Sequence, residues 1–270
     1  MSLDPFGGDA FALNAELPMS ILSPSSISTF MRCQEQFRRE YLLREKRAPG
    51  AWGISGTAFH AARHAILELQ ATLRRAIPDE EVEAVYKTAW DKTLAKEGEI
   101  EWRGATAEGQ YALGLGMLAE YHRTLGAEVI PIRMEYGAKG YVDGVPLPIY
   151  GRIDVETSEE VIDTKTGKNL VHKLKPEWYV QGCIYVLLTG KPIRWHSVSQ
   201  KPAAATNDML RLDPRPKVLE AGRRFARDSY EGIRDLLRTR GREVEWPGTG
   251  PATGTCNYCS FRSRCLYVPD

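Results

Sequence analysis

The amino-acid sequence predicts a mixed α/β fold, in which a central mixed sheet is flanked by helices. Helical periodicity dominates up to about residue 127, and strand-like alternation of apolar residues begins only after it. A helical pattern at 176–189 then interrupts the strands, and this order of elements favours a mixed sheet. The chain of 270 residues is long enough to bury the core of one large domain or two small ones.

Four helices are predicted before the strands. Candidate N-cap residues between Ser23 and Ser28 precede an amphipathic run over 29–44, in which apolar residues recur at spacings of three and four. Pro49-Gly50 follows this run as a break. The next three helices are predicted over 55–76, 79–97 and 105–125.

Strands are predicted mainly in the second half of the chain. Residues 128–136 alternate between apolar and polar side chains, with Arg133 and Glu135 on the polar face. Pro176 is a favourable first residue for the helix over 176–189. The strands are predicted over 128–136, 147–157, 160–166, 193–199 and 209–212, and a basic last helix over 215–240.

Composition and element order divide the chain into four segments. Residues 1–18 contain Gly, Pro and Ala without periodicity, and are expected to be a flexible leader or a tag. Residues 19–127 are expected to form a helical region, residues 128–246 a sheet-containing core, and residues 247–270 a cysteine-rich cap.

Charge and hydropathy exclude several classes of protein. The 36 basic and 35 acidic residues give a net charge of +1, which excludes a histone-like polycation but leaves room for a local basic groove. No apolar run approaches the roughly 18 residues that span a bilayer, and no secretory signal is visible. The five cysteines, an odd number, argue against a disulfide framework, so a cytoplasmic location without a membrane partner is expected.

Two carboxylates are predicted to face each other across a hairpin. A two-residue turn at 158–159 sets a register that places Asp154 opposite Asp163, and Lys165 then shares the strand face of Asp163. Two carboxylates this close repel each other unless a cation lies between them, and a divalent metal with oxygen ligands supplies one. The same pattern is also compatible with a surface hairpin whose charges face solvent.

Two helices carry further candidate residues. His60 lies in a helical run with small residues, where a lone histidine is more often structural than functional. His60 and His64 have the i, i+4 spacing of a zinc-protease helix, but the glutamate of that motif is missing. Gln181 and Tyr185 lie one turn apart on an otherwise apolar helix, where alone they would be packing residues.

The cysteines suggest a second metal centre. Cys256, Cys259 and Cys265 all fall within the last 15 residues, which indicates thiolates gathered for a metal. From the residues alone, a structural zinc ion and an iron–sulfur cluster are equally compatible, because both accept four thiolates.

Taken together in chain order, the motifs of this sequence resemble those of the RecB-like branch of the PD-(D/E)XK nuclease superfamily. Each motif is weak alone, and the resemblance rests on their ordered combination over residues 23–265. It is closest to compact iron–sulfur members without a helicase domain, such as CRISPR-associated adaptation exonucleases and phage exonucleases. The matching motifs are Ser23–Cys33 with Phe37 and Tyr41, Gly56-x-x-Phe59-His60, Gly151-x-x-Asp154, Asp163-Thr164-Lys165, Gln181-x-x-x-Tyr185 and Cys256-x2-Cys259-x5-Cys265.

The resemblance implies a restriction-endonuclease-like fold and a role for each matching residue. Lys165 would be the catalytic lysine, and Gln181 and Tyr185 would line the site and contact DNA. Glu135 would support the metal or bind a second one. Many relatives carry Glu where this chain has Asp163, although the RecB-like branch accepts Asp. The implied ligands of a catalytic Mg²⁺ or Mn²⁺ are His60, Asp154, Asp163 and the carbonyl group of Thr164.

The family also implies an iron–sulfur cap. Cys33, Cys256, Cys259 and Cys265 would hold a [4Fe–4S] cluster that joins the first helix to the C-terminal segment, with zinc on the same four residues as the alternative. Cys183 has no partner in this scheme and is expected to be a buried core thiol.

The implied function is that of a Mg²⁺- or Mn²⁺-dependent DNA exonuclease that acts at DNA ends or on single strands. The alternative is a catalytically inactive module of the same fold that binds DNA ends or assembles a complex. The presence of His60, Asp154, Asp163 and Lys165 together favours the enzyme. Among relatives, partners include recombination or CRISPR-adaptation proteins and copies of the same chain, and a phage-encoded member would act in the host cytoplasm.

Basic and aromatic residues near these motifs are candidates for DNA contacts. Arg38 and Arg39 flank Cys33 and are expected to contact phosphates. Trp178 and Tyr179 could stack on bases, although core packing is expected for at least one of them. Further basic candidates are Arg32, Lys168, Lys173, Lys175, Arg223, Arg224, Arg227, Arg262 and Arg264.

Overall fold

The computed structural model describes residues 17–45, 50–75, 77–102, 104–250 and 254–268. The expected leader over residues 1–18 lies almost entirely outside the described residues. Of its last two residues, Leu17 is buried against the core formed by the first helices and strand β2.

The centre of the molecule is a five-stranded mixed sheet in the order β1-β2-β3-β4-β5. Strands β3 and β4 are parallel, and the other neighbouring strands are antiparallel. Helix α7 (Pro176–Thr189) connects the two parallel strands, as such a connection requires. The strands are β1 (Arg133–Val142), β2 (Val145–Glu156), β3 (Val161–Gly167), β4 (Ile193–Ser199) and β5 (Thr206–Leu212).

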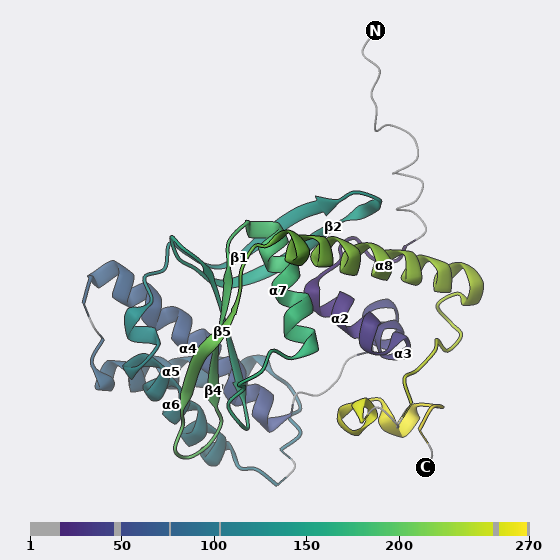
Figure 1. Cartoon of the computed structure of the whole chain (residues 1–270). Coiled ribbons are helices and arrows are strands. Elements are labelled where there is room, and N and C mark those ends of the chain that lie inside the picture. The colour runs from purple at the N-terminus through teal and green to yellow at the C-terminus, as the bar shows by residue number, and fades with distance from the viewer. Residues whose placement is uncertain (1–16, 46–49, 76, 103, 251–253, 269–270) are drawn as a thin grey trace.

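Helices cover both faces of the sheet (Figure 1). Helices α7 and α8 (Pro216–Arg240) pack on one face, where Val161 and Trp195 contribute to the core. The other face carries Ile162 and Val198, which pack against helices on that side. The alternation of side chains along each strand therefore separates the two helical layers. The helices of the second layer are α4 (Ala51–Leu73), α5 (Asp79–Lys96) and α6 (Ala107–Arg123).

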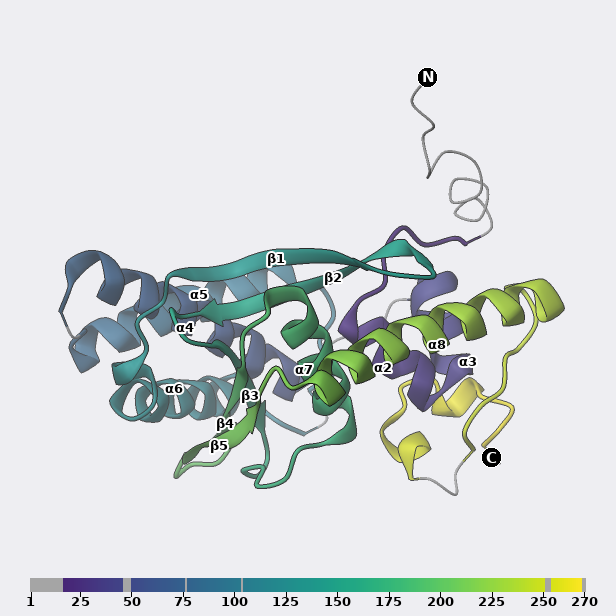
Figure 2. The same cartoon turned by 45° about the horizontal axis from the view of Figure 1, so that its top comes forward.

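The first helical run is broken at Cys33 rather than continuous over 29–44. Helix α2 (Pro24–Arg32) starts with the predicted cap, because the Ser23 hydroxyl accepts a hydrogen bond from the Ser26 N–H at 3.1 Å. Cys33 then adopts an extended conformation, with φ −159° and ψ 112°. Helix α3 (Gln34–Phe37) and the π-helix η1 (Arg38–Leu42) follow and lie beside the C-terminal segment (Figures 1 and 2).

The helices before residue 128 do not pack as one unit. Those up to Leu42 share a core with β2, α7, α8 and Trp246. Helices α4, α5 and α6 share a different core with each other and with Val198 of β4. The two groups therefore reach opposite ends of the sheet, as Figure 2 shows.

The strand predicted over 128–136 begins too early. Residues 126–128 form the short 3₁₀-helix η2, and β1 starts at Arg133. Ile130 and Ile132, which the alternation placed on a buried face, are 78% and 56% exposed. Pro131 lies between them and has no N–H to donate to a strand ladder, which explains why pairing starts later. The helix over 176–189 and the strand over 193–199 have the predicted bounds.

Two further short helices, η4 (Thr255–Tyr258) and η5 (Arg262–Arg264), form the C-terminal segment. Within the described part of the chain, no helix combines the length and apolar character that crossing a membrane requires.

Candidate functional site

Three carboxylates occupy one row across the first three strands. The pairs Met134–Val155 and Tyr136–Ile153 flank Glu135 and Asp154, so these two residues lie at opposite register positions. The pair Val155–Ile162 places Asp163 at the next position opposite Asp154. This is the register that the two-residue turn predicted.

The β2–β3 ladder ends immediately before this row. Its last pair is Val155 with Ile162, while β1 and β2 continue together as a long hairpin away from the other strands (Figure 2). The Thr164 N–H, which has no strand partner on that side, donates to Asp154 Oδ2 at 3.2 Å. The carboxylates therefore lie at a fork between two strands, where helices from both layers can reach them.

Helix α4 brings two basic residues to the fork. His60 Nδ1 is 3.7 Å from Asp154 Oδ2. The Arg63 guanidinium lies 3.4 Å from Asp154 Oδ2 and 3.8 Å from Glu135 Oε1, and it also donates to the Thr164 hydroxyl. Arg63 is 1% exposed, so this cation is a buried part of the site.

Arg63 was not among the residues predicted from the sequence. Its signal was its place one turn after His60, which puts both side chains on the same helix face. Arginine on a helix usually faces solvent, and only the fold shows that this face is turned toward the carboxylates.

Helix α7 approaches the fork from the other layer. Gln181 donates to Asp163 Oδ1 at 3.1 Å and to the Tyr185 hydroxyl at 3.0 Å. The Tyr185 hydroxyl in turn donates to the carbonyl oxygen of Arg152 at 2.6 Å. A Cβ at Gly151 would lie 2.7 Å from the Tyr185 ring, so glycine is needed for this approach. Tyr185 is buried, and it orients Gln181 rather than facing solvent.

Lys165 pairs with the innermost carboxylate. Its Nζ lies 2.7 Å from Asp163 Oδ2. The Lys165 side chain is 26% exposed, whereas that of Asp163 is 2% exposed. Lys165 therefore connects a buried acid with the surface of the site.

The environment shifts the pKa values of the carboxylates in opposite directions. Burial raises the pKa of Asp163 to about 6; nearby Lys165 opposes this rise and the Asp154 charge adds to it. Burial also acts to raise the pKa of Asp154, but Arg63, His60 and Lys165 outweigh it, so this pKa is lowered. Asp154 thus ionises first, and the Asp163 proton is lost near neutral pH.

The pKa of His60 is lowered to about 4. Burial is the main cause, and the cations Arg63 and Lys165 add to it, while Asp154 acts in the opposite direction. His60 is therefore neutral at pH 7, which is the form in which an imidazole binds a metal.

The carboxylates are turned toward cations of the chain. Asp163 pairs with Lys165, Asp154 lies beside Arg63, and Glu135 accepts a hydrogen bond from Arg152 at 2.8 Å. Among the residues that the structure describes, no three His, Cys, Asp or Glu side chains converge closely enough to hold a metal ion. The donor set of carboxylates and a neutral imidazole suits Mg²⁺ or Mn²⁺ by its chemistry, and binding requires side-chain rotation.

One family model matches most of the chain. The model of the PD-(D/E)XK nuclease superfamily matches residues 21–266. The chain belongs to this superfamily. No curated protein matches the sequence.

Two solved structures align with this nuclease chain. A protein from Eubacterium rectale, described as a "putative exonuclease", aligns with a TM-score of 0.57 and 12% identity over 100% of this chain and 96% of that one. This likeness confirms the restriction-endonuclease-like fold. A structure named SSO0001 aligns with a TM-score of 0.37 and 14% identity over 88% of this chain and 94% of that one.

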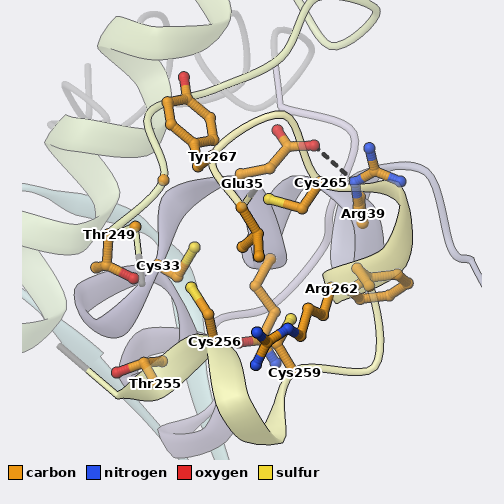
Figure 3. Close-up of a pocket in the computed structure, with 15 residues that line it drawn as sticks. Cys33, Glu35, Arg39, Thr249, Thr255, Cys256, Cys259, Arg262, Cys265 and Tyr267 are labelled. Atoms are coloured by element: carbon orange, nitrogen blue, oxygen red, sulfur yellow. Dashed lines mark hydrogen bonds and ion pairs between the residues drawn. The ribbon is translucent and has the colours of Figure 1, made fainter. Parts of the chain in front are cut away.

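The four cysteines of the predicted cluster line one pocket of the nuclease (Figure 3). Cys33 comes from the break between α2 and α3, and the other three come from the C-terminal segment. Burial raises the pKa of the Cys259 thiol, and the three neighbouring cysteines raise it further. Cys183 lies elsewhere, on α7, where it is buried in another core. The fold therefore gathers the four cysteines and leaves out the fifth, as expected.

A buried ion-pair group fixes one wall of this cysteine pocket. Glu35 accepts hydrogen bonds from Arg38 Nε at 2.8 Å, Arg39 Nε at 2.7 Å and the Trp246 N–H at 2.8 Å. Arg39 also donates to the Arg264 carbonyl oxygen at 3.2 Å. We call these contacts the Glu35 clamp, since they join α3 to the chain that follows α8.

The expectation that Arg38 and Arg39 contact phosphates is therefore wrong. Both side chains are buried and neutralise Glu35. Trp178 is also buried, with Lys175 Nζ 5.0 Å from its ring centroid. Among the basic candidates, Lys168, Lys173 and Lys175 line an open hollow beside Lys165.

The first prediction concerns Asp163 in the metal-free protein. Because folding raises its pKa from 3.8 to about 6, the native state holds a proton in this window that the unfolded state releases. The contribution of Asp163 to the free energy of unfolding must therefore fall as pH rises from 4 to 6. Asp163→Asn removes this cost and should stabilise the metal-free protein by about 1–3 kcal/mol at pH 8, and by less than about 1 kcal/mol at pH 4.

Urea denaturation in EDTA at both pH values measures this difference. Asp235→Asn, which changes an exposed aspartate, should have little effect at either pH. A destabilised Asp163→Asn at pH 8 would show that Asp163 is stabilised as an anion.

The second prediction concerns the Glu35 clamp. Burial acts to raise the pKa of Glu35, but hydrogen bonds from Arg38, Trp246 and Arg39 outweigh it and lower the pKa. Glu35→Gln removes the carboxylate that pairs with both buried guanidinium groups and leaves Arg39 only Glu45 at 3.5 Å, so it should cost about 3 kcal/mol of stability at pH 7. The difference should shrink as pH falls through the lowered pKa of Glu35, where the wild type loses the same charge.

Chemical denaturation of Glu35→Gln beside Glu243→Gln provides the comparison. Glu243 pairs with Arg242 at the surface, so its loss should cost less than about 1 kcal/mol. If both variants lost the same small amount of unfolding free energy, this would contradict a stabilising role for the clamp.

Proposed function

We propose that this chain is a Mg²⁺- or Mn²⁺-dependent DNA exonuclease that hydrolyses phosphodiester bonds at DNA ends or in single strands. The observation that carries the proposal is the fork between β2 and β3. There Asp154 and Asp163 meet His60 from one helical layer, and Lys165 extends from the buried acid toward the surface. Membership of a nuclease superfamily supports a nucleic-acid substrate.

His60, Asp154, Asp163 and the Thr164 carbonyl group are the proposed holders of the divalent ion. When bound, such an ion polarises the phosphate and lowers the pKa of a water molecule. Because the pKa of Asp163 is about 6, this carboxylate is mostly ionised at neutral pH and is available to a cation. Gln181 then keeps one oxygen of Asp163 oriented through its 3.1 Å hydrogen bond.

Lys165 is the proposed catalytic lysine. Its partly exposed ammonium group can reach a phosphate oxygen or the attacking water while its strand remains fixed in the sheet. A fixed positive charge at this position stabilises the negative charge that develops on phosphate during hydrolysis.

Arg63 has a supporting role in this proposal. Its buried guanidinium balances Asp154 and Glu135, which would otherwise repel each other at adjacent register positions. Glu135, which has a φ of 46°, is also paired with Arg152. Glu135 therefore supports the site through these two arginines.

We further propose that the cysteine pocket holds a [4Fe–4S] cluster. The four thiols line one pocket, with those of Cys33, Cys256 and Cys265 turned toward the space between them (Figure 3). A single zinc ion on the same four thiolates is the alternative. The resemblance to iron–sulfur members of the superfamily favours the cluster.

The alternative is a catalytically inactive module of the same fold that binds DNA ends. The observation in its favour is that each carboxylate at the fork already has a cation of the chain beside it. The two functions differ in whether DNA is cut when a divalent metal is supplied.

The third prediction separates these two functions. Wild-type protein should degrade end-labelled single- or double-stranded DNA when Mg²⁺ or Mn²⁺ is added. Lys165→Ala should slow cleavage at least ~100-fold, because one electrostatic or acid–base group is lost. Lys139→Ala, which removes an exposed lysine from β1, should cut as the wild type does. A wild type that cuts no DNA would favour the inactive module, and an active Lys165→Ala would place the chemistry elsewhere.

The fourth prediction concerns the cluster. Anaerobically purified protein should be brown and contain iron and acid-labile sulfide. Cys33→Ser should remove the colour and lower the melting temperature, since three thiolates remain in the pocket. Cys183→Ser is the matched control and should keep the colour, because this buried thiol lies in another core. A colourless protein with one zinc ion per chain would contradict the assignment.

A further inference from the structure

One face of helix α4 leads from the proposed metal site to an exposed tryptophan. Trp52, Gly56 and His60 are spaced by four residues, so they lie on the same side of the helix. Trp52 and His60 are two turns apart, roughly 12 Å along the axis. Together with Thr166 and Gln200 they line one open hollow of about 580 Å³.

Trp52 is exposed but held in place. Its side chain is 49% exposed, which is unusual for the largest apolar residue. Its backbone is fixed, because the Trp52 carbonyl oxygen accepts hydrogen bonds from Gln200 Nε2 at 3.3 Å and Ser55 Oγ at 3.2 Å. The indole ring therefore stands at the edge of the hollow on a rigid element.

Between Trp52 and His60, helix α4 lines the hollow with two glycines, Gly53 and Gly56, and the small residue Thr57. At Gly53 an added Cβ would meet no atom within 4 Å, so this position faces open space. At Gly56 an added Cβ would lie 3.1 Å from the Thr166 hydroxyl, which shows how closely α4 approaches β3. A nucleic-acid strand can therefore pass along this face to the fork without meeting a large side chain.

The surroundings have the charge that a phosphate backbone requires. Thr166 lines both this hollow and a second one. The second hollow carries Lys165, Lys168, Lys173 and Lys175. No carboxylate is among the described residues that line either hollow. A nucleic-acid strand would thus cross the fork with cationic groups on one side and an aromatic ring on the other.

We infer that Trp52 is a stacking subsite for an unpaired nucleobase, about two helical turns from the phosphate that is cleaved. An indole face can stack on any base whose face is free, and this preference selects single-stranded nucleic acid without selecting sequence. The inference rests on the proposed nuclease function, and it adds the substrate form and the residue that recognises it.

Binding of a labelled single-stranded 12-mer in EDTA tests the inference without cleavage. Trp52→Ala should weaken binding ~10-fold, the scale of one lost base–aromatic stack. Trp52→Phe should retain most of the affinity, because a ring remains. Tyr141→Ala removes another exposed aromatic side chain, at the end of β1, and should bind as the wild type does.

An abasic scan locates the subsite. In wild-type protein, one abasic position in the 12-mer should reduce affinity ~10-fold. Trp52→Ala should bind the same abasic oligonucleotide and the intact 12-mer with equal affinity. Equal affinities of the wild type and Trp52→Ala, or an abasic penalty that is the same in both proteins, would overturn the inference.

A minimal substrate separates this inference from the proposed function. Hydrolysis of bis(p-nitrophenyl) phosphate, which cannot reach Trp52 from the fork, should be equal in the wild type and Trp52→Ala when Mn²⁺ is present. A loss of this hydrolysis in Trp52→Ala would show that the substitution acts through the active site instead. If the wild type hydrolyses neither DNA nor this ester, the nuclease proposal fails, while the EDTA binding comparison still decides the stacking subsite.

Discussion

The balance of charge at the fork between β2 and β3 is the constraint on which the rest of the structure depends. Three carboxylates at adjacent register positions would destabilise a sheet if nothing neutralised them. The chain supplies the buried Arg63 from α4 and Lys165 from β3 itself. Both helical layers are therefore needed, since α4 brings the cation and α7 orients Asp163 through Gln181. The early end of the β2–β3 ladder gives these side chains their space.

A second buried charge group, the Glu35 clamp, connects the ends of the chain. It ties α3 to Trp246 and, through Arg39, to the carbonyl oxygen of Arg264. These contacts place Cys33 beside the C-terminal cysteines by protein interactions alone. A cluster bound there would strengthen a connection that the protein already makes. Arg38 and Arg39 thus serve the fold, whereas Lys165, Lys168, Lys173 and Lys175 line an open hollow.

Local rules predicted the parts of the structure that local geometry determines. The turn at 158–159 and the period-two pattern fixed the opposition of Asp154 and Asp163, because strand register follows from the turn. The start of α7 followed from Pro176. In the structure Gly190, whose φ is 69°, ends the helix. The ordered motifs also predicted which residues lie together: His60, Asp154, Asp163 and Lys165 lie at the fork, and four cysteines line one pocket.

Long-range packing decided what the sequence could not show. Arg63, Arg38 and Arg39 look like surface arginines of amphipathic helices, and only tertiary contacts bury them against carboxylates. The extended residue Cys33 interrupts a run with good helical periodicity because it turns toward a segment more than two hundred residues later. Tyr185, expected to contact DNA, instead donates to the Arg152 carbonyl oxygen inside the site.

Calorimetric titration with Mn²⁺ tests most directly whether the fork is a metal site. Binding must displace the Asp163 proton below its pKa of about 6. The predicted result is one Mn²⁺ per chain at pH 8, roughly tenfold weaker binding at pH 5, and no binding at this site in Asp154→Ala. Titrations of Asp154→Ala and Asp163→Ala that match the wild type at both pH values would contradict the account.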